Sequence, residues 1–505
     1  RALLSALDLT LLVNEDKDGF AFPSAEAMYR AYEGSLYRFD QLYRQFCEAA
    51  DAVEAQGWDI LKALRGSIES AYGNGFLLPL AMKWGDLLQA GLLSEWRIPG
   101  VPNQWSFFER HVRGPLKGGE TKRAYVVVSD ALRFEAAHEL ASELNGRYRF
   151  AATLSSQLGV LPSITRLGMA SLLPHGKLSL TDQGDVLADG QSTSGTANRK
   201  KLLSAHGGTA VTAEDLLAMR RDEARAAFKD CEVVYVYHNA IDSVGDSAAT
   251  QGETFQGVRR AVEELLALTR FIVNSLNGSY VVLTADHGFL FQKEPPTSTE
   301  KSGLSTKPHQ PMIEKKRYVL GRSLGVSDQA YVGSTDATAN TDDGAEFWVP
   351  KGINRFHFSG GAQYYHGGAM LQEIVVPVIV VREKESDDQK PRPVAVHVLG
   401  SSPKITTNAH RFQLLQADAV SARRSALTVK LAIYDGEREI SNVATVTLDS
   451  PSDSIDERSK TVFLTLKSGN YDRNKPYHLI LRNAEDQVEL QRIEVAIDLS
   501  IQNDF

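Results

Sequence analysis

The sequence predicts a multidomain chain with an α-helical N-terminal region, a middle α/β region on a mostly parallel sheet, and a C-terminal β-sandwich. Three observations predict this fold class. Apolar residues recur at helical spacing within residues 1–118, continuous apolar runs alternate with helical patterns over 119–385, and short strands separated by turn signals fill 386–505. Since 505 residues exceed what one hydrophobic core usually serves, we expect the three regions to be domains.

The first region is expected to be helical and to carry no chemistry. Pro23 and Ser24 suit the start of a helix, with Ser24 as its cap. The stretch 113–119 is interpreted as a linker to the next domain. Aromatic residues at helical spacing serve a core far more often than a ligand cage. Six residues would form one apolar face: Leu36, Phe39, Tyr43, Phe46, Ala50 and Val53.

The middle region contains three apolar runs, 125–130, 233–242 and 280–286, and each ends on an aspartate. A strand in the centre of a parallel sheet is apolar on both faces, so it shows a continuous run and no alternation. Helical patterns at 132–144 and 257–276 suit crossover helices, and 373–381 is a further apolar run. Two polar stretches are interpreted as irregular loops, with lids as the alternative: 178–198 and 294–307.

The aspartates Asp130, Asp242 and Asp286 are expected to meet at one edge of this sheet. Ligands of such sheets bind beyond the carboxyl ends of the strands. Three carboxylates gathered there would repel one another at neutral pH, so a positive group should lie among them. A metal centre is the natural candidate.

The C-terminal region shows the pattern of an immunoglobulin-type sandwich, whose expected role is docking or scaffolding. It follows a charged, proline-containing boundary at 386–393, and Asp435-Gly436 is a strong hairpin signal. Strands are expected at 394–399, 427–434, 443–448, 461–466, 477–481 and 489–497.

Composition excludes several classes of protein. A hydrophobic content of 43% with 23% charged residues is typical of a soluble globular protein, and a net charge of -8 argues against a general nucleic-acid coat or a basic membrane-surface protein. Cys47 and Cys231 lie far apart, which suits a reducing cytoplasm and excludes a disulfide framework. No apolar run reaches the roughly 20 residues that span a bilayer. Because Arg1 stands in what resembles the middle of a helix, we expect a fragment of a longer protein.

Besides the three aspartates, the middle region contains a candidate nucleophile and further candidate metal ligands. Thr165 falls in the first turn of an expected helix, with Ser163 as its cap, and free N–H groups at a helix start stabilise an anion. A hydroxyl there that touched a metal would have a lowered pKa and could attack as an alkoxide. Each residue alone has an ordinary structural use, but the combination favours a catalytic site. The further ligand candidates are Asp246, His287 and His366.

Five motifs together resemble the alkaline phosphatase superfamily in its PglZ branch. The resemblance covers roughly residues 121–385 and implies an alkaline-phosphatase-like core. It also implies a cytoplasmic component of a BREX bacteriophage-defence system, with a site-specific DNA methyltransferase and large ATPases as partners and no membrane. The motifs occur in the family's order at 128–133, 162–166, 238–246, 285–288 and 366–373.

The resemblance further implies two divalent metal ions, zinc in the first place, at the carboxyl edge of the sheet. One ion would be bound by Asp130, Asp286 and His287, with Thr165 beside it as the nucleophile.

The second ion would be bound by Asp242, Asp246 and His366. Here the chain departs from the superfamily, which commonly has a histidine at the position of Asp246. A carboxylate in place of an imidazole hardens the site, so manganese or magnesium becomes an alternative to zinc.

Three further residues are candidates for substrate contact. Arg133 and Arg166 lie near the expected centre and could hold a phosphate with two parallel hydrogen bonds, although surface ion pairs are an equal alternative. His238 could support a metal ligand, or it could be a satisfied histidine of the core.

The sequence therefore predicts a metal-dependent phosphatase or phosphodiesterase that works by two-metal phosphoryl transfer with a threonine nucleophile. Its substrate stays open among a phosphomonoester, a nucleotide, a phosphodiester and a DNA end. A rival interpretation is a non-catalytic scaffold subunit with a structural metal site, which Asp246 favours. A third is an isomerase of the same superfamily that returns the phosphate to its substrate.

Overall fold

The computed structural model describes the chain except for residues 18, 58, 148–149, 294–300, 303, 305, 357–362, 384–391, 400–403, 422–423, 486 and 500–505. The chain divides into two compact units. The first comprises residues 1–142 and 151–383, and the second comprises 143–150 and 384–505. The helical region and the α/β region thus share one unit. The predicted boundary at 386–393 lies mostly outside the described residues.

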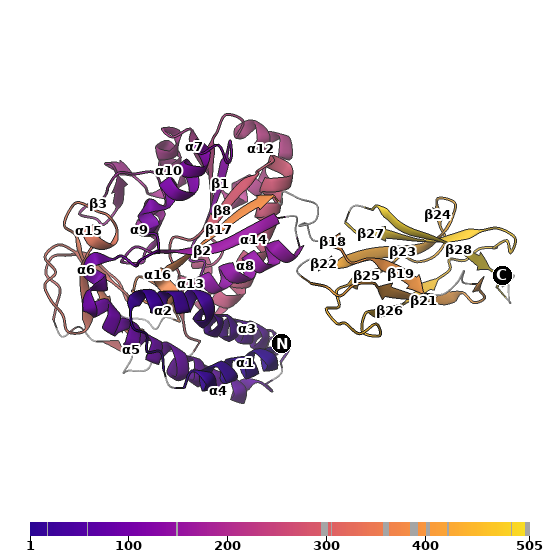
Figure 1. Ribbon diagram of the computed structural model, residues 1–505, viewed down its shortest axis with the longest axis horizontal. Coiled ribbons are helices and arrows are strands. Elements are labelled where there is room, and N and C mark those ends of the chain that lie inside the picture. The colour runs from indigo at the N-terminus through magenta and orange to yellow at the C-terminus, as the bar shows by residue number, and fades with distance from the viewer. Residues whose placement is uncertain are drawn as a thin grey trace. The chain divides into compact units, whose positions relative to one another are not determined.

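The N-terminal region is helical, as predicted, and in Figure 1 its indigo helices lie along one side of the sheet. Ser24 caps the second helix, because its hydroxyl accepts the backbone N–H of Ala27 at 3.1 Å. The predicted apolar face is buried from Leu36 to Ala50, and its last member, Val53, is half-buried. The helices are α1 (Ala2–Glu15), α2 (Ala25–Ala31), α3 (Tyr37–Glu54), α4 (Lys62–Tyr72), α5 (Leu78–Leu87) and α6 (Leu93–Glu95).

The expected linker at 113–119 is mostly helical. A π-helical turn over Phe108–Arg113 runs into α7 (Gly114–Lys117). Pro115 stands in the first turn of α7, so the residues that resembled a break lie within a helix.

A six-stranded mixed sheet forms the centre of the α/β region, in the order β2-β17-β8-β1-β7-β6. Strands β8, β1, β7 and β6 are parallel, as the apolar runs predicted, and β17 is antiparallel to β8. Ser129 lies opposite His238, and Val128 lies opposite Thr284, so the three central strands end at one level. The strands are β1 (Ala124–Ser129), β2 (Phe150–Leu158), β6 (Gly208–Thr212), β7 (Val233–His238), β8 (Tyr280–Thr284) and β17 (Val375–Glu383).

Both expected crossover helices are present, as α8 (Phe134–Arg147) and α14 (Thr254–Leu276). The stretch 178–198 is not an irregular loop. It contains β3 (Leu178–Leu180), β4 (Val186–Ala188) and β5 (Gln191–Ser192) before α10 (Gly195–Ser204) begins. The other polar stretch, 294–307, lies largely outside the described residues.

Shorter elements complete the α/β region around the ends of the central strands. They include helices α9 (Thr165–Ser171), α11 (Ala213–Ala218), α12 (Arg221–Ala227), α13 (Asp242–Gly245), α15 (Thr335–Thr338) and α16 (Leu371–Ile374). A four-stranded antiparallel sheet has the order β11-β12-β14-β13, from β11 (Pro311–Glu314), β12 (Val319–Gly321), β13 (Ala330–Ser334) and β14 (Glu346–Pro350). Two pairs remain: β9 (Leu290–Phe291) with β16 (Tyr364–Tyr365), and β10 (Lys301–Ser302) with β15 (Arg355–Phe356).

The C-terminal unit consists of strands in two main sheets that share one apolar core. The first sheet is β19-β21-β26, and the second is β20-β28-β27-β23-β24, with β25 paired to β23. The Asp435-Gly436 signal is confirmed as a hairpin, since Asp435 pairs with Arg438 across the turn. The immunoglobulin type stays a prediction. The strands are β18 (Arg392–Pro393), β19 (Val396–Leu399), β20 (Lys404–Ile405), β21 (Ala409–Gln416), β22 (Arg424–Ser425), β23 (Leu427–Asp435), β24 (Arg438–Glu439), β25 (Ala444–Leu448), β26 (Ser459–Thr465), β27 (Tyr477–Asn483) and β28 (Glu489–Ile497).

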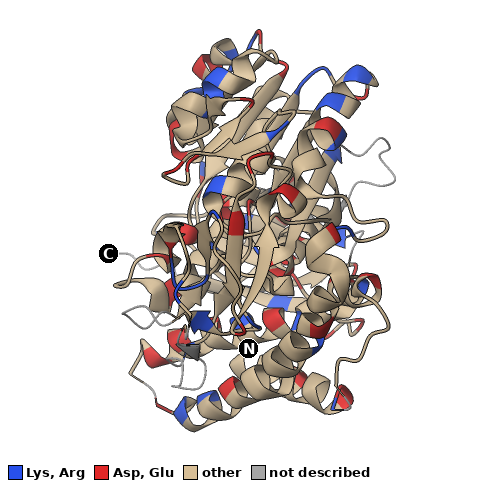
Figure 2. Ribbon diagram, turned by 90° about the vertical axis from the view of Figure 1, so that its left-hand side faces the viewer, with Lys and Arg blue, Asp and Glu red and all other residues tan. Residues whose placement is uncertain are grey.

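The charged residues of the first unit are distributed as expected for a protein of ordinary composition. Figure 2 shows acidic and basic positions interspersed along the helices of the first unit, in keeping with a net charge of only -8. Among the described helices, none is both long and apolar enough to cross a membrane.

Candidate active site

The ends of three adjacent parallel strands bring the predicted acids together. Asp130 directly follows β1, Asp286 follows β8 and Asp242 begins α13 after β7. Ala131 adopts a left-handed backbone with φ of 62°, and its N–H donates to Asp286 Oδ1 at 3.1 Å. The N–H of His287 donates to the same oxygen at 3.0 Å. One oxygen of Asp286 is therefore fixed by the backbone, which leaves the other for a different partner.

Two buried carboxylate oxygens at this edge have no hydrogen-bond partner, Asp130 Oδ1 and Asp286 Oδ2. Burial, and then the charges of Asp286 and Asp242, hold the pKa of Asp130 well above its usual range. Burial is also the main cause that raises the pKa of Asp286 to about 7. Unpaired acids are costly inside a protein, and a bound cation would satisfy both oxygens. The donor set therefore fits a divalent metal ion.

Both histidines of the site present Nε2 to the acids. His287 Nδ1 lies 2.9 Å from the carbonyl oxygen of Gly288, and His366 Nδ1 lies 3.1 Å from that of Ser163. Because a carbonyl oxygen can only accept, each Nδ1 is assigned the proton, and each Nε2 keeps a lone pair for a metal. Burial lowers the pKa of both rings, which favours this neutral form. The rings stack with their centroids 4.0 Å apart.

Within the described residues, the ligand atoms form two groups whose members all lie within 4.8 Å of one another. The first group is Asp130, Asp286 and His287, as expected. Its His287 Nε2 lies 3.7 Å from Asp130 Oδ1 and 3.4 Å from Asp286 Oδ2.

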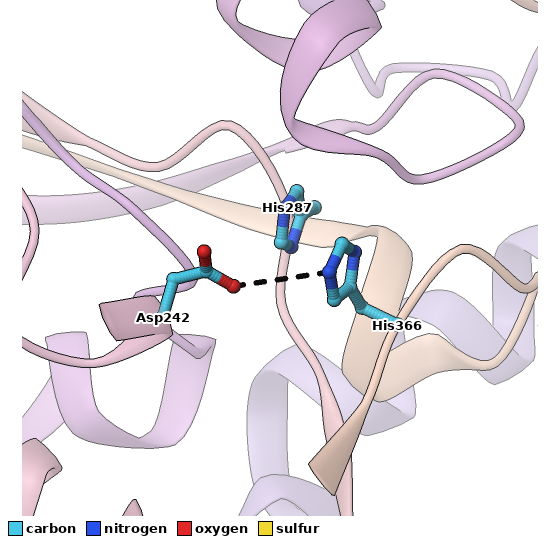
Figure 3. Close-up of side chains that lie close together, drawn as sticks. All are labelled: Asp242, His287 and His366. Carbon is cyan, nitrogen blue, oxygen red and sulfur yellow. Dashed lines mark ion pairs between the residues drawn. The ribbon is translucent and has the colours of Figure 1, made fainter. Parts of the chain in front are cut away.

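The second group is Asp242, His287 and His366, so it contains His287 where Asp246 was expected. Figure 3 shows the Asp242 carboxylate and the His366 ring pointing toward each other, with Oδ1 and Nε2 3.8 Å apart. Asp246 is exposed at the end of α13 and lines the adjoining cavity without joining either group.

Thr165 is the first residue of α9, and its Oγ1 lies 3.1 Å from His287 Nε2. The expected cap at Ser163 is wrong. Ile164 occupies the cap position, and the Ser163 hydroxyl instead donates to the carbonyl oxygen of Gly368 at 2.7 Å and accepts the N–H of Gly367 at 3.1 Å. Ser163 thus fixes the loop that carries His366, since both neighbouring glycines are held by it.

Two glycines allow the backbone segments of the site to approach closely. A Cβ on Gly168 would lie 2.3 Å from the carbonyl oxygen of Asp286, and one on Gly288 would lie 2.0 Å from that of Gln372. Any side chain at either position would push apart the segments that carry Thr165, Asp286 and His287.

The three candidate substrate residues have different surroundings. Arg133 is buried and pairs with Asp40 of α3 at 2.6 Å, so its guanidinium is directed into the helical layer. His238 uses both nitrogens, toward Ser129 Oγ at 3.0 Å and Glu264 Oε2 at 2.8 Å, which matches a satisfied histidine. These contacts do not favour substrate binding by either residue. Arg166 is 52% exposed beside Thr165 and pairs with Asp185 at 3.2 Å.

Thr165 borders two cavities. One of about 830 Å³ is also lined by Asp130 and His238. The other, of about 580 Å³, is also lined by Asp242 and His366. Several lining residues were not identified from the sequence, because isolated basic or aromatic positions carry no pattern. They include Arg199 and Arg260 in the larger cavity, and Lys315, Lys316, Tyr318 and Tyr364 in the smaller one.

Fold and site together define an alkaline phosphatase-like protein. The family model described as "BREX system PglZ alkaline phosphatase-like domain" matches residues 107–381. The chain belongs to the PglZ family.

Two curated relatives match the whole chain. It is 40% identical to "Alkaline phosphatase-like protein BrxZ" of Escherichia coli O9:H4 (strain HS) over 512 residues. It is 34% identical to "Alkaline phosphatase-like protein PglZ" of Bacillus cereus (strain H3081.97) over 515 residues. The chain spans 59% of the length of each relative.

Among solved structures, the chain is similar to murine and human ectonucleotide pyrophosphatase / phosphodiesterase 5. The murine protein matches 52% of this chain and 88% of its own, with a TM-score of 0.36 and 9% identity. The human protein matches 52% and 87%, with a TM-score of 0.35 and 9% identity.

Proposed function

We propose that the protein is a metal-dependent phosphoric ester hydrolase, a phosphatase or phosphodiesterase, that transfers a phosphoryl group to Thr165. The observation that carries this proposal is the position of the threonine. Its Oγ1 lies 3.1 Å from His287 Nε2, which also faces the two partnerless carboxylate oxygens of Asp130 and Asp286. Membership of an alkaline phosphatase-like family supports the same class of reaction.

Two ions would be held by the two ligand groups. Asp130, Asp286 and His287 would hold the first, while Asp242 and His366 would hold the second. For Asp246 to complete the second set, its exposed side chain would have to turn inward. Divalent ions at these positions, zinc or else manganese or magnesium, would supply the positive charge that stabilises an alkoxide and the charge developing on phosphorus.

The chain's own residues then account for the remaining steps. The Thr165 hydroxyl would give up its proton to solvent water, because His287 Nε2, which lies 3.1 Å from Oγ1, would be occupied by the first ion. Thr165 Oγ1 forms a bond to phosphorus as the bond to the leaving alcohol breaks, and the alcohol takes up a proton. Water then cleaves the threonine ester and restores the hydroxyl. The exposed guanidinium of Arg166 would hold a phosphate oxygen during both steps.

The test combines metal content with turnover. The purified chain should contain divalent metal and should hydrolyse nitrophenyl phosphate as a monoester or a diester with zinc, manganese or magnesium. Thr165→Ala should retain the metal but lose activity on the order of a thousandfold or more, because the attacking atom is gone. Asp286→Ala should lose both metal and activity. Full activity in both variants would contradict the mechanism.

The second candidate function is a scaffold subunit with a structural metal site. The position of Asp246 outside both ligand groups favours it, since an incomplete second site suits a protein without turnover. Bound metal without hydrolysis of either ester would support the scaffold. Release of free phosphate, and no transfer back to the substrate, would separate the hydrolase from a superfamily isomerase.

The role in the cell is proposed to be that of a cytoplasmic BREX component that acts with a methyltransferase and a large ATPase of the same system. The description of the family and the names of the relatives support this assignment. Co-purification with each component from cells that express the whole system tests it. Recovery of the chain alone would count against it.

The division into domains at 1–118, 119–385 and 386–505 is likewise a proposal, with the last domain an immunoglobulin-like sandwich used for docking. The shared core of the two C-terminal sheets supports a sandwich. Substitution of its exposed residues should then weaken binding to a partner without changing hydrolysis.

A further inference from the structure

Tyr364 connects a pair of short strands, each next to one histidine of the site, to the helix that carries Asp242. It lies on β16, where it pairs with Phe291 of β9, while the next residue, Tyr365, pairs with Leu290. His366 directly follows β16, and His287 shortly precedes β9. The Tyr364 side chain leaves this ladder and reaches α13, where its hydroxyl donates to Asp242 Oδ1 at 2.8 Å.

The ring of Tyr364 is held in place on several sides. Gly245 of α13 lies against it so closely that an added Cβ would be 2.5 Å from the ring carbons. The ring centroid lies 4.9 Å from that of Phe289 and 5.9 Å from that of His366. Only 4% of the residue is exposed. The hydroxyl therefore has a fixed direction toward Asp242, because the ring cannot turn away.

The Asp242 oxygen that accepts this hydrogen bond is the same oxygen that lies toward His366 in the second ligand group. Asp242 Oδ1 lies 3.8 Å from His366 Nε2 (Figure 3). A carboxylate oxygen has two lone pairs, so a hydrogen bond to one of them fixes the direction of the other. Hydrogen bonds of this kind to a metal ligand typically change metal affinity by about 10–100-fold when removed.

We propose that Tyr364 is a positioning residue that orients Asp242 for the ion that Asp242 and His366 would hold; this inference rests on the proposed function. The ordinary alternative is that Tyr364 only fills the core, in which case its ring matters and its hydroxyl does not.

Tyr365 provides a matched control. It has the same 4% exposure and the adjacent position on the same strand. Its hydroxyl donates to Gln292 Oε1 at 2.7 Å and to no acid of the site. Each Tyr→Phe change removes one buried hydroxyl, so the general loss of stability should be similar in both variants.

The experiment measures metal binding by the full chain and does not depend on turnover. The metal-free wild type, Tyr364→Phe and Tyr365→Phe are titrated with zinc by calorimetry, and their cobalt absorption spectra are recorded as a second measurement. The wild type should bind two ions. Tyr364→Phe should bind one of them about 10–100-fold more weakly and change the cobalt spectrum, while Tyr365→Phe should match the wild type.

A double variant shows whether Tyr364 acts through Asp242. Asp242→Asn should itself weaken the second site, and Tyr364→Phe should add no further loss in that background. Wild-type affinity in Tyr364→Phe, or an equal loss in Tyr365→Phe, would overturn the positioning role alone. A wild-type chain that binds none of zinc, manganese and magnesium would overturn the proposed function and this inference with it.

Discussion

Asp286 combines two opposite environments in one side chain. Its Oδ1 accepts two backbone N–H groups, whereas its buried Oδ2 has no hydrogen-bond partner. Burial outweighs the two donors and raises its pKa from 3.8 to about 7. Near neutral pH, this carboxylate therefore destabilises the metal-free fold and favours a bound cation.

This balance predicts how the stability of the metal-free protein depends on pH. The pKa of Asp286 in the folded protein exceeds its unfolded value of 3.8. Its contribution to the stability of the fold is therefore fully present below pH 3.8 and is lost as the pH rises to about 7. Asp130 acts in the same direction. The melting temperature in chelator should therefore fall across this window, and it should fall less in Asp286→Asn, which has no proton to lose. Identical slopes for the two proteins would contradict the prediction.

At the level of single residues, the sequence predicted which residues lie at the candidate site better than it predicted the contacts of their side chains. Asp130, Asp242, Asp286 and His287 could be placed because each follows an apolar run, and strand ends converge whatever the loops do. The substrate role expected for Arg133 depended on the direction of its side chain, which pairs with Asp40, a buried acid 93 positions earlier on α3. No local pattern encodes such a contact.

At the scale of elements, a buried polar cluster joins the N-terminal helices to the sheet edge that carries the candidate site. Asp40 of α3 accepts the hydroxyls of Tyr32 and Tyr72 and pairs with Arg133, which lies three residues beyond Asp130. Both members of the ion pair have fully buried side chains. The helical region thus supports the turn between β1 and α8, although none of its described residues joins either ligand group.

Removing this acid should be costly. Asp40→Ala leaves Arg133 buried without its partner, so the free energy of unfolding should fall by about 3–5 kcal/mol. Urea unfolding of the metal-free chain measures the change. Arg38→Ala, at an exposed position on the same helix, should change stability by no more than about 0.5 kcal/mol. A loss below about 1 kcal/mol for Asp40→Ala would show that water or another residue replaces the acid.

The elements that could be predicted are those with a long apolar signal. The three parallel strands and both crossover helices were recognisable, because a central sheet and its covers must be apolar. The antiparallel direction of β17 could not be predicted, because an apolar run reads the same in either orientation. The small strands β3, β4 and β5 have two or three residues each, too few to show a period.

For the whole molecule, the two compact units have separate cores. The C-terminal core contains residues of its own strands, such as Val429, Leu431, Leu479 and Leu481. The residues of both ligand groups all belong to the first unit: Asp130, Asp242, Asp286, His287 and His366. Metal binding should therefore not require the second core.

A chain that ends at Glu383 tests this separation. It should fold, bind metal in the same ratio and hydrolyse the same esters as the 505-residue chain, since every proposed ligand is retained. Metal analysis and circular dichroism measure the outcome. Loss of the fold in the shortened chain, together with intact metal binding in the full chain, would show that the C-terminal strands are needed for the first unit to form.

The glycines at 168 and 288 have a consequence for how the family diverges. A proposed ligand such as Asp242 could be exchanged with a change of metal or a loss of turnover, because its neighbours would stay in place. A side chain at 168 or 288 would separate the polypeptide segments themselves, so selection for the fold alone is enough to retain both glycines. Homologues that have lost catalysis should therefore lose acids and histidines first and keep these two positions, which makes the glycines markers of ancestry and the ligands markers of activity.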